Sequence, residues 1–163
     1  MKYKITKQAK QEALDYEKKV SKTSTLKREN YTNLSTTGRY YIGYLGEWGF
    51  AQFLKEAGIP FTWETLADGK SDDGDFLINN KKTDVKTAGK PFHKNLMFPE
   101  KQLIHHRDIY VGCRLNGEFV EVWGFIDRKT MEETPSKDFG YGIPTKSILL
   151  SDLIPIEKFE NED

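Results

Sequence analysis

Apolar side chains recur at helical spacing over two stretches in the first third of the chain. Between residues 5 and 30 a narrow apolar stripe runs among charged residues, and it consists of Ile5, Ala9, Ala13 or Leu14, Tyr16 and Val20. Between residues 38 and 57 a second stripe consists of Ile42, Leu45, Gly49, Phe53 and Leu54. Hydroxyl side chains at 35–37 can cap the second stretch, and Gly58 can end it. The pattern predicts two helices, the second facing a core.

Beyond residue 60 the apolar runs become short and alternating, as in strands. A strand is predicted at 61–65, a hairpin at 75–87 and a second hairpin at 108–126 that turns at Asn116 and Gly117. Glycine and prolines make 88–100 a predicted loop, followed by one or two helical turns at 99–106. The last predicted elements are a short helix at 127–133, a turn-rich loop at 139–144 and a short strand or helix start at 148–150. This order predicts an α/β (α+β) chain.

The predicted hairpin at 75–87 contains three charged residues that could form a catalytic site. Asp84 and Lys86 alternate with Val85, so they share one face of an extended strand while Val85 faces the other way. A turn at Asn79 and Asn80 would bring Asp75 to the same end of the hairpin. Two carboxylates and a lysine would then converge on a space that suits Mg²⁺, which prefers one or two carboxylates, waters and phosphate oxygens.

Composition bounds the class of protein. The 163 residues are enough for one domain with a core, and no apolar run approaches the length of a membrane span. The basic start lacks the apolar segment of a signal peptide. The single cysteine, Cys113, excludes an intrachain disulfide and a cysteine-cluster zinc site, and it fits a reducing compartment. We therefore expect a cytoplasmic protein that does not enter a membrane.

The net charge is zero, but the charges are unevenly distributed. Residues 1–30 carry nine basic and four acidic side chains, and residues 81–107 carry seven and two. Residues 31–80 and 118–163 are acidic, with three basic against seven acidic and five against eleven. Acids that hold a metal ion and a basic rim that holds phosphates would give this combination. Solvated charged surfaces would give it as well.

A carboxylate also interrupts the second predicted helix. Glu47 lies among Tyr44, Trp48 and Phe50, and a carboxylate in such apolar surroundings needs a partner. The alternative is a side chain that points to water beside the apolar stripe.

The order of helix acid, strand acid and acid-x-lysine resembles the PD-(D/E)XK nuclease superfamily. Glu47 matches the helix acid, Asp75 the strand acid, and Asp84 with Lys86 the acid-x-lysine pair. The resemblance spans 38–87, and Gly74 stands where the name motif has proline. It implies a restriction-endonuclease-like core at 35–163, with a central mixed sheet flanked by helices, and an added N-terminal helical arm at 1–34. That arm would either pack on the domain or reach for a partner.

A fainter resemblance points to small superfamily members from phages and other mobile elements. It rests on motifs spread along the chain: Gly46-Glu47, Gly74-Asp75-Phe76, Asp84-Val85-Lys86-Thr87, Asp108-Ile109-Tyr110-Val111, Trp123-Gly124-Phe125 and Gly140-Tyr141-Gly142. A phage-encoded protein would act in the host cytoplasm, in DNA processing, recombination or restriction.

The resemblance implies a deoxyribonuclease, with an endonuclease favoured over an exonuclease. Mg²⁺ or Mn²⁺ would be held by Asp75 and Asp84, by the Val85 carbonyl, and by Glu47 through water or with a second ion. Lys86 would orient the attacking water and stabilise the transition state. One active site cuts one strand, so a homodimer is expected. A non-catalytic nucleic-acid-binding domain of the same fold, or an exposed hairpin with a surface ion pair, are the alternatives.

The basic segment after Lys86 supplies candidates for binding DNA. Lys90, Lys94 and Lys101 would contact phosphates, and His93 would do the same unless it is an ordinary loop histidine. Tyr141 lies between two glycines, where it would stack on a base or simply close a turn.

Overall fold

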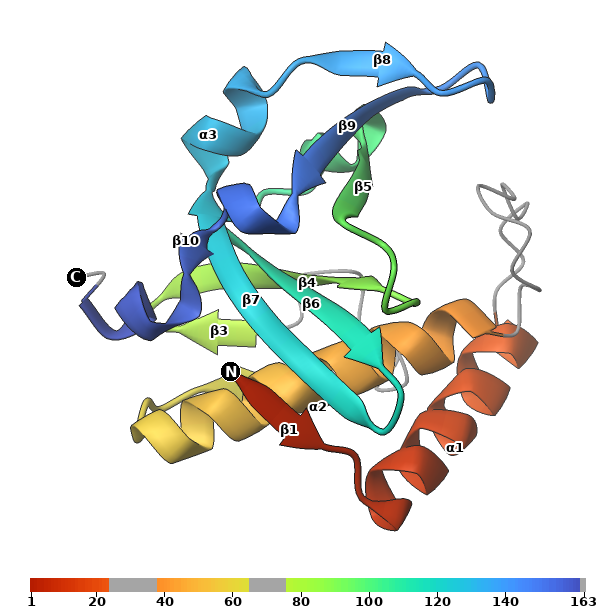
Figure 1. Cartoon of the computed structure of the whole chain (residues 1–163), viewed down its shortest axis with the longest axis vertical. Coiled ribbons are helices and arrows are strands. Elements are labelled where there is room, and N and C mark those ends of the chain that lie inside the picture. Colours follow the sequence, from red (N-terminus) through yellow and green to blue (C-terminus); the bar gives the residue numbers. More distant parts are fainter. Residues whose placement is uncertain (24–37, 65–75, 162–163) are drawn as a thin grey trace.

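The computed structural model describes residues 1–23, 38–64 and 76–161 (Figure 1). Its strands are β1 (Lys2–Lys4), β2 (Thr62–Trp63), β3 (Phe76–Ile78), β4 (Lys81–Ala88), β5 (Asn95–Pro99), β6 (Ile109–Asn116), β7 (Phe119–Asp127), β8 (Ser136–Asp138), β9 (Pro144–Leu149) and β10 (Ile154–Pro155). Its α-helices are α1 (Lys7–Thr23), α2 (Gly38–Ala57) and α3 (Arg128–Glu133). Short 3₁₀ helices are η2 (Glu100–Ile104), η3 (Leu150–Asp152) and η4 (Ile156–Asn161).

The strands form two sheets. The larger sheet has the order β1-β7-β6-β4-β3-β2, with β10 also paired to β7, and the smaller has the order β5-β9-β8. The larger sheet is mixed, because β4 and β6 run parallel while the other pairs are antiparallel. The predicted α+β class, a mixed central sheet with flanking helices, is thus confirmed.

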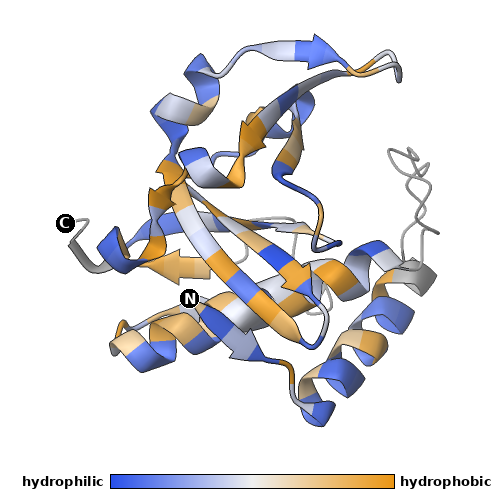
Figure 2. Ribbon diagram, viewed as in Figure 1, coloured by the Kyte–Doolittle hydropathy of each residue, from blue (hydrophilic) through white to orange (hydrophobic). Residues whose placement is uncertain are grey.

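Helix α2 covers one face of the larger sheet and has the predicted bounds. Leu45 and Phe50 of α2 share one buried core with Val85 of β4. Two glycines let the helix lie close to the strands: a Cβ at Gly46 would overlap the Thr87 hydroxyl, and one at Gly49 would overlap Val120. The other face of the sheet packs on β5 and β9 through a second core that includes Tyr110, Phe98 and Ile148. The sheet therefore lies between α2 and the smaller sheet (Figure 2).

The N-terminal segment is part of this packed structure. Strand β1, which the sequence pattern did not predict, pairs with β7 at the edge of the larger sheet. Helix α1 follows and packs beside α2, with Ala9, Ala13, Tyr16 and Val20 buried. Of the two readings of the predicted helix at 5–30, the structure favours the packed one over residues 7–23. Residues 24–37 lie outside the described part of the chain.

Both hairpins form where the sequence predicts them. Asn79 and Asn80 have φ angles of 47° and 62°, the left-handed backbone that a tight turn between twisted strands requires. Gly117 has a φ of 59° between β6 and β7. Cys113 of β6 is fully buried, and this burial raises the pKa of its thiol.

The smaller sheet was not predicted. The sequence pattern predicts a loop at 88–100. In the structure β5 occupies residues 95–99 and pairs with β9, which covers residues 144–149. In β5 the apolar Leu96 and Phe98 are buried while Asn95 and Met97 are exposed. The sequence contains this alternation, but Pro91 and Pro99 on either side of it favour a loop, so the pattern did not predict a strand. The predicted turns after Pro99 are confirmed as η2.

Within the described residues, no helix is long and apolar enough to cross a membrane.

Candidate active site

The acid-x-lysine pair of β4 lies on the face of the sheet opposite α2. Val85 is buried in the core that α2 covers, whereas Lys86 Nζ lies 2.9 Å from Asp84 Oδ2 and 5.2 Å from the centre of the Phe98 ring. The side chain of Asp84 is 10% exposed and that of Lys86 is 28% exposed. The prediction that Asp84 and Lys86 share one face is confirmed.

These two residues follow the described pairing of β3 with β4 directly. Strand β3 pairs with β4 through residues 81–83, while β6 pairs with β4 from Thr83 to Ala88. Asp75 immediately precedes β3 in the sequence, but it lies outside the described residues.

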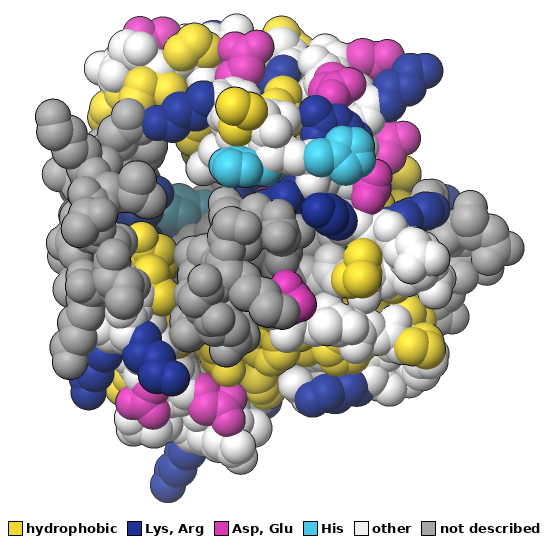
Figure 3. Space-filling model, turned by 180° about the vertical axis from the view of Figure 1, so that it is seen from behind, with side chains coloured by type: hydrophobic (Ala, Val, Ile, Leu, Met, Phe, Trp, Pro, Cys, Tyr) yellow, Lys and Arg dark blue, Asp and Glu magenta, His cyan; other side chains and the backbone are white. Residues whose placement is uncertain are grey.

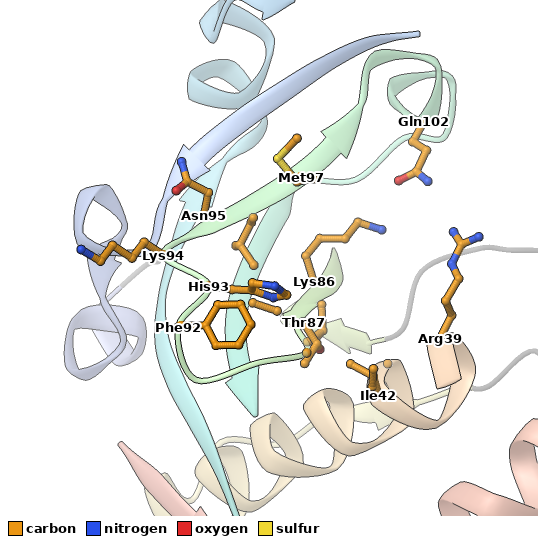
Figure 4. Close-up of a pocket in the computed structure, with 15 residues that line it drawn as sticks. Arg39, Ile42, Lys86, Thr87, Phe92, His93, Lys94, Asn95, Met97 and Gln102 are labelled. Atoms are coloured by element: carbon orange, nitrogen blue, oxygen red, sulfur yellow. The ribbon is translucent and has the colours of Figure 1, made fainter. Parts of the chain in front are cut away.

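A groove of about 690 Å³ opens beside this part of β4 (Figure 4). Its walls come from the first two turns of α2, the end of β4, the segment 89–94, strand β5 and η2. Among the described residues that line it, the ionisable side chains are all basic or histidine: Arg39, Lys86, His93 and Lys94. Arg39 and Gln102 reach toward the end of Lys86 from opposite sides of the groove. Such a lining attracts anions.

The same region is basic on the molecular surface. Figure 3 shows Lys, Arg and His side chains gathered around a hollow between the two layers of the molecule. The protein thus concentrates positive charge at one place although its net charge is zero.

Glu47 is buried and has a partner. It is 8% exposed, and Trp63 Nε1 donates a hydrogen bond of 2.8 Å to its Oε2. The expectation that this carboxylate needs a partner is confirmed, and the alternative of a water-facing side chain is wrong. Glu47 is carried by α2, the helix on the far face of the sheet from Asp84, and it is not among the residues that line the groove.

The residues predicted to bind nucleic acid fall into two groups. His93 and Lys94 line the groove, and the exposed Lys90 belongs to the same segment. Lys101 lies on η2 beside Gln102, which lines the groove. Tyr141, 59% exposed, lies in the loop between β8 and β9 and does not line it.

The Tyr141 loop has its own internal support. Backbone N–H groups of Gly140, Tyr141 and Gly142 donate to the Asp138 carboxylate. These hydrogen bonds, that from Gly140 first, lower the pKa of Asp138. These bonds order the backbone of the loop, and both readings of the exposed Tyr141 side chain stay predictions.

Sequence reasoning missed Arg39 and Phe92 as groove residues. Arg39 lies in the first turn of α2, and its position in the groove depends on the packing of that turn against the end of β4, which no local pattern shows. Phe92 had no local signal either, since the residues flanking it form no regular element. Trp123 is 37% exposed and stacks under Arg114, whose guanidinium lies 4.8 Å from its ring centre.

The Asp84 carboxylate on β4 could supply one oxygen ligand to a divalent cation such as Mg²⁺. Asp84 Oδ2 is buried, and the Lys86 ammonium lies 2.9 Å from it. A buried carboxylate oxygen of this kind is a ligand that Mg²⁺ or Mn²⁺ takes readily. Among residues 1–23, 38–64 and 76–161, no three Asp, Glu, His or Cys side chains come together to hold a metal. The set implied by the resemblance also needs Asp75, which is outside those ranges.

Comparison with known proteins returns no match to a protein-family model, to a curated protein or to a solved structure.

Proposed function

We propose that this protein is a divalent-metal-dependent nuclease that hydrolyses phosphodiester bonds of DNA. The observation that carries the proposal is the position of the Asp84–Lys86 pair. It lies on the face of β4 opposite α2, and its lysine lines a groove whose described ionisable side chains are basic or histidine. The chain order also supports it, because a helix with a buried acid precedes β3 and β4, as the PD-(D/E)XK resemblance implies.

The metal would be held by Asp84 and Asp75 with the Val85 carbonyl. Glu47, which accepts a hydrogen bond from Trp63 on the α2 side of the sheet, would lie outside this ligand set. When bound, Mg²⁺ or Mn²⁺ supplies polarisation of the scissile phosphate and a lowered pKa for a bound water. Lys86 places a compact positive charge beside Asp84, where it would orient the attacking water and stabilise charge that develops on the phosphate oxygens.

The groove would hold the rest of the substrate. Arg39 and Lys94 line the same groove as Lys86 and would neutralise backbone phosphates without reading the sequence of bases. The exposed Lys90, in the segment that carries Lys94, would add a further phosphate contact. Because one active site cuts one strand, cleavage of both strands of a duplex would need a second copy of the chain.

The testing experiment is cleavage of supercoiled, linear duplex, branched and single-stranded DNA with Mg²⁺ or Mn²⁺, and with a chelator. Wild type is compared with Asp84→Asn and Lys86→Met. We expect Asp84→Asn to lose metal binding and cleavage. Lys86→Met should retain metal binding and lose at least about 100-fold in turnover, because transition-state charge is then unsupported.

Matched controls come from exposed residues that do not line the groove, Lys55→Met at the end of α2 and Asp152→Asn in η3. Both should cleave as wild type does. If no DNA or RNA is cut while the protein still binds nucleic acid, the nuclease proposal is wrong, and the protein is a non-catalytic nucleic-acid-binding domain.

A further inference from the structure

One wall of the groove presents an aromatic ring to solvent. Phe92 is 73% exposed, and it lines the groove together with His93 and Lys94. Its ring meets the His93 ring edge-on, with the ring centres 4.9 Å apart. Most of the Phe92 surface is thus left open beside a basic groove (Figure 4).

Hydrogen bonds hold the backbone of the segment that carries Phe92. His93 N–H donates to the Lys90 carbonyl, which closes a four-residue turn with Pro91 in its second position. Arg114 donates to the His93 carbonyl at 3.3 Å, and Leu150 N–H donates to the Lys94 carbonyl at 2.9 Å. A ring held out on a supported turn loses little conformational entropy when it binds a flat partner.

We propose that Phe92 is a nucleobase-stacking residue, and that the groove accepts an unpaired nucleotide strand in preference to a duplex. The inference rests on the proposed function, and it names the form of nucleic acid that the same groove takes. Lys86, Lys94 and Arg39 attract the phosphates, while the Phe92 ring offers a surface for one base. A base in a duplex is already stacked on its neighbours, and releasing it costs a few kcal/mol.

The experiment measures binding by fluorescence anisotropy in chelator, so that no strand is cut. The probes are a labelled twelve-residue oligo-dT, a twelve-unit abasic strand with the same phosphates, and a blunt duplex of twelve base pairs. Wild type should bind oligo-dT roughly 5- to 150-fold more tightly than the abasic strand, the range expected for one stacked base. It should also prefer oligo-dT to the duplex.

Three variants locate the effect. Phe92→Ala should bind oligo-dT and the abasic strand equally, whereas Phe92→Trp should keep the difference and show quenching of the added indole on binding. Ile104→Ala removes another strongly exposed apolar side chain, 84% exposed, that does not line the groove, and it should bind as wild type does.

Two failures would be distinct. If wild type binds oligo-dT well but Phe92→Ala retains the preference over the abasic strand, the stacking role is wrong and the nuclease proposal stands. A tighter affinity for the duplex than for oligo-dT would likewise overturn the inference alone. If wild type binds none of the probes and cuts no DNA, both the inference and the proposed function are wrong.

Discussion

At the scale of single residues, two glycines of α2 differ sharply in their surroundings. A Cβ at Gly46 would overlap the hydroxyl of Thr87 on β4, whereas a Cβ at Gly43 would meet nothing within 4 Å. Only Gly46 therefore sets how closely the helix approaches the strand of Asp84 and Lys86. The two positions are less than one helical turn apart, which makes them a matched pair.

We expect Gly46→Ala to lower the free energy of unfolding by about 1–3 kcal/mol, because the added methyl group overpacks a buried contact. Gly43→Ala should be neutral or raise it by up to about 1 kcal/mol, because alanine favours helix. Urea unfolding followed by circular dichroism measures both. Equal changes in the two variants would show that the contact with Thr87 does not determine the spacing.

The residues of the candidate site also differ in how well the sequence alone predicts their positions. Asp84 and Lys86 were placed correctly on one face, since side chains of a strand alternate with a period of two. Phe92 was not singled out, because its exposure and its place beside Lys86 depend on a supported turn that is anchored by Arg114 and Leu150. Neither anchor is close to Phe92 in the sequence.

At the scale of elements, α3 shows how a short helix is stabilised. Its N-cap Asp127 accepts a hydrogen bond of 2.7 Å from Thr130 N–H. Hydrogen bonding from the Thr130 side chain, and then from this N–H, lowers the pKa of Asp127. At the other end, buried Lys146 of β9 donates to the carbonyls of Glu132 and Thr134. The helix is thereby joined to the smaller sheet.

The lowered pKa of Asp127 predicts a pH dependence. The folded-state pKa lies below the unfolded value, so the stabilisation is present above the unfolded pKa and is lost as the pH falls through the folded one. Asp127→Asn keeps a capping oxygen but cannot titrate. We expect the advantage of wild type over Asp127→Asn, measured by urea unfolding, to shrink between pH 7 and about pH 3.

Asp127→Ala should cost about 1 kcal/mol at pH 7, since it removes the cap altogether. If the difference between wild type and Asp127→Asn is the same at both pH values, the charge of Asp127 contributes nothing to the cap.

At the scale of the whole molecule, uneven charge matters more than total charge. The chain is neutral overall, but the described ionisable side chains around the groove are basic or histidine. Under the proposed function, binding to nucleic acid therefore releases counterions and weakens as salt rises. A neutral protein would otherwise show little attraction for a polyanion.

We expect the logarithm of the affinity for single-stranded DNA to fall linearly with the logarithm of salt concentration. Lys94→Ala should reduce the steepness of that slope by about 0.7, the effect of losing one phosphate contact on a single strand. Lys158→Ala, an exposed lysine in η4 that does not line the groove, serves as the control. Identical slopes for wild type and Lys94→Ala would exclude Lys94 from the binding surface.

The sequence by itself determined the elements that rest on local physics. The bounds of α2 followed from apolar spacing and a terminal glycine, and the β3–β4 turn followed from two asparagines that tolerate a left-handed backbone. The alternation of Asp84, Val85 and Lys86 followed from the geometry of an extended chain. Each of these depends on residues within a few positions of one another.

Only the tertiary structure decided what surrounds them. Strand β1 at the edge of the larger sheet, the pairing of β5 with β9 and the groove that joins Arg39 to Phe92 all bring together distant parts of the chain. Such contacts are set by which buried faces pack and which strands pair, and no local pattern specifies the partner. The groove exists because a helix, a strand end and a second sheet meet at one place.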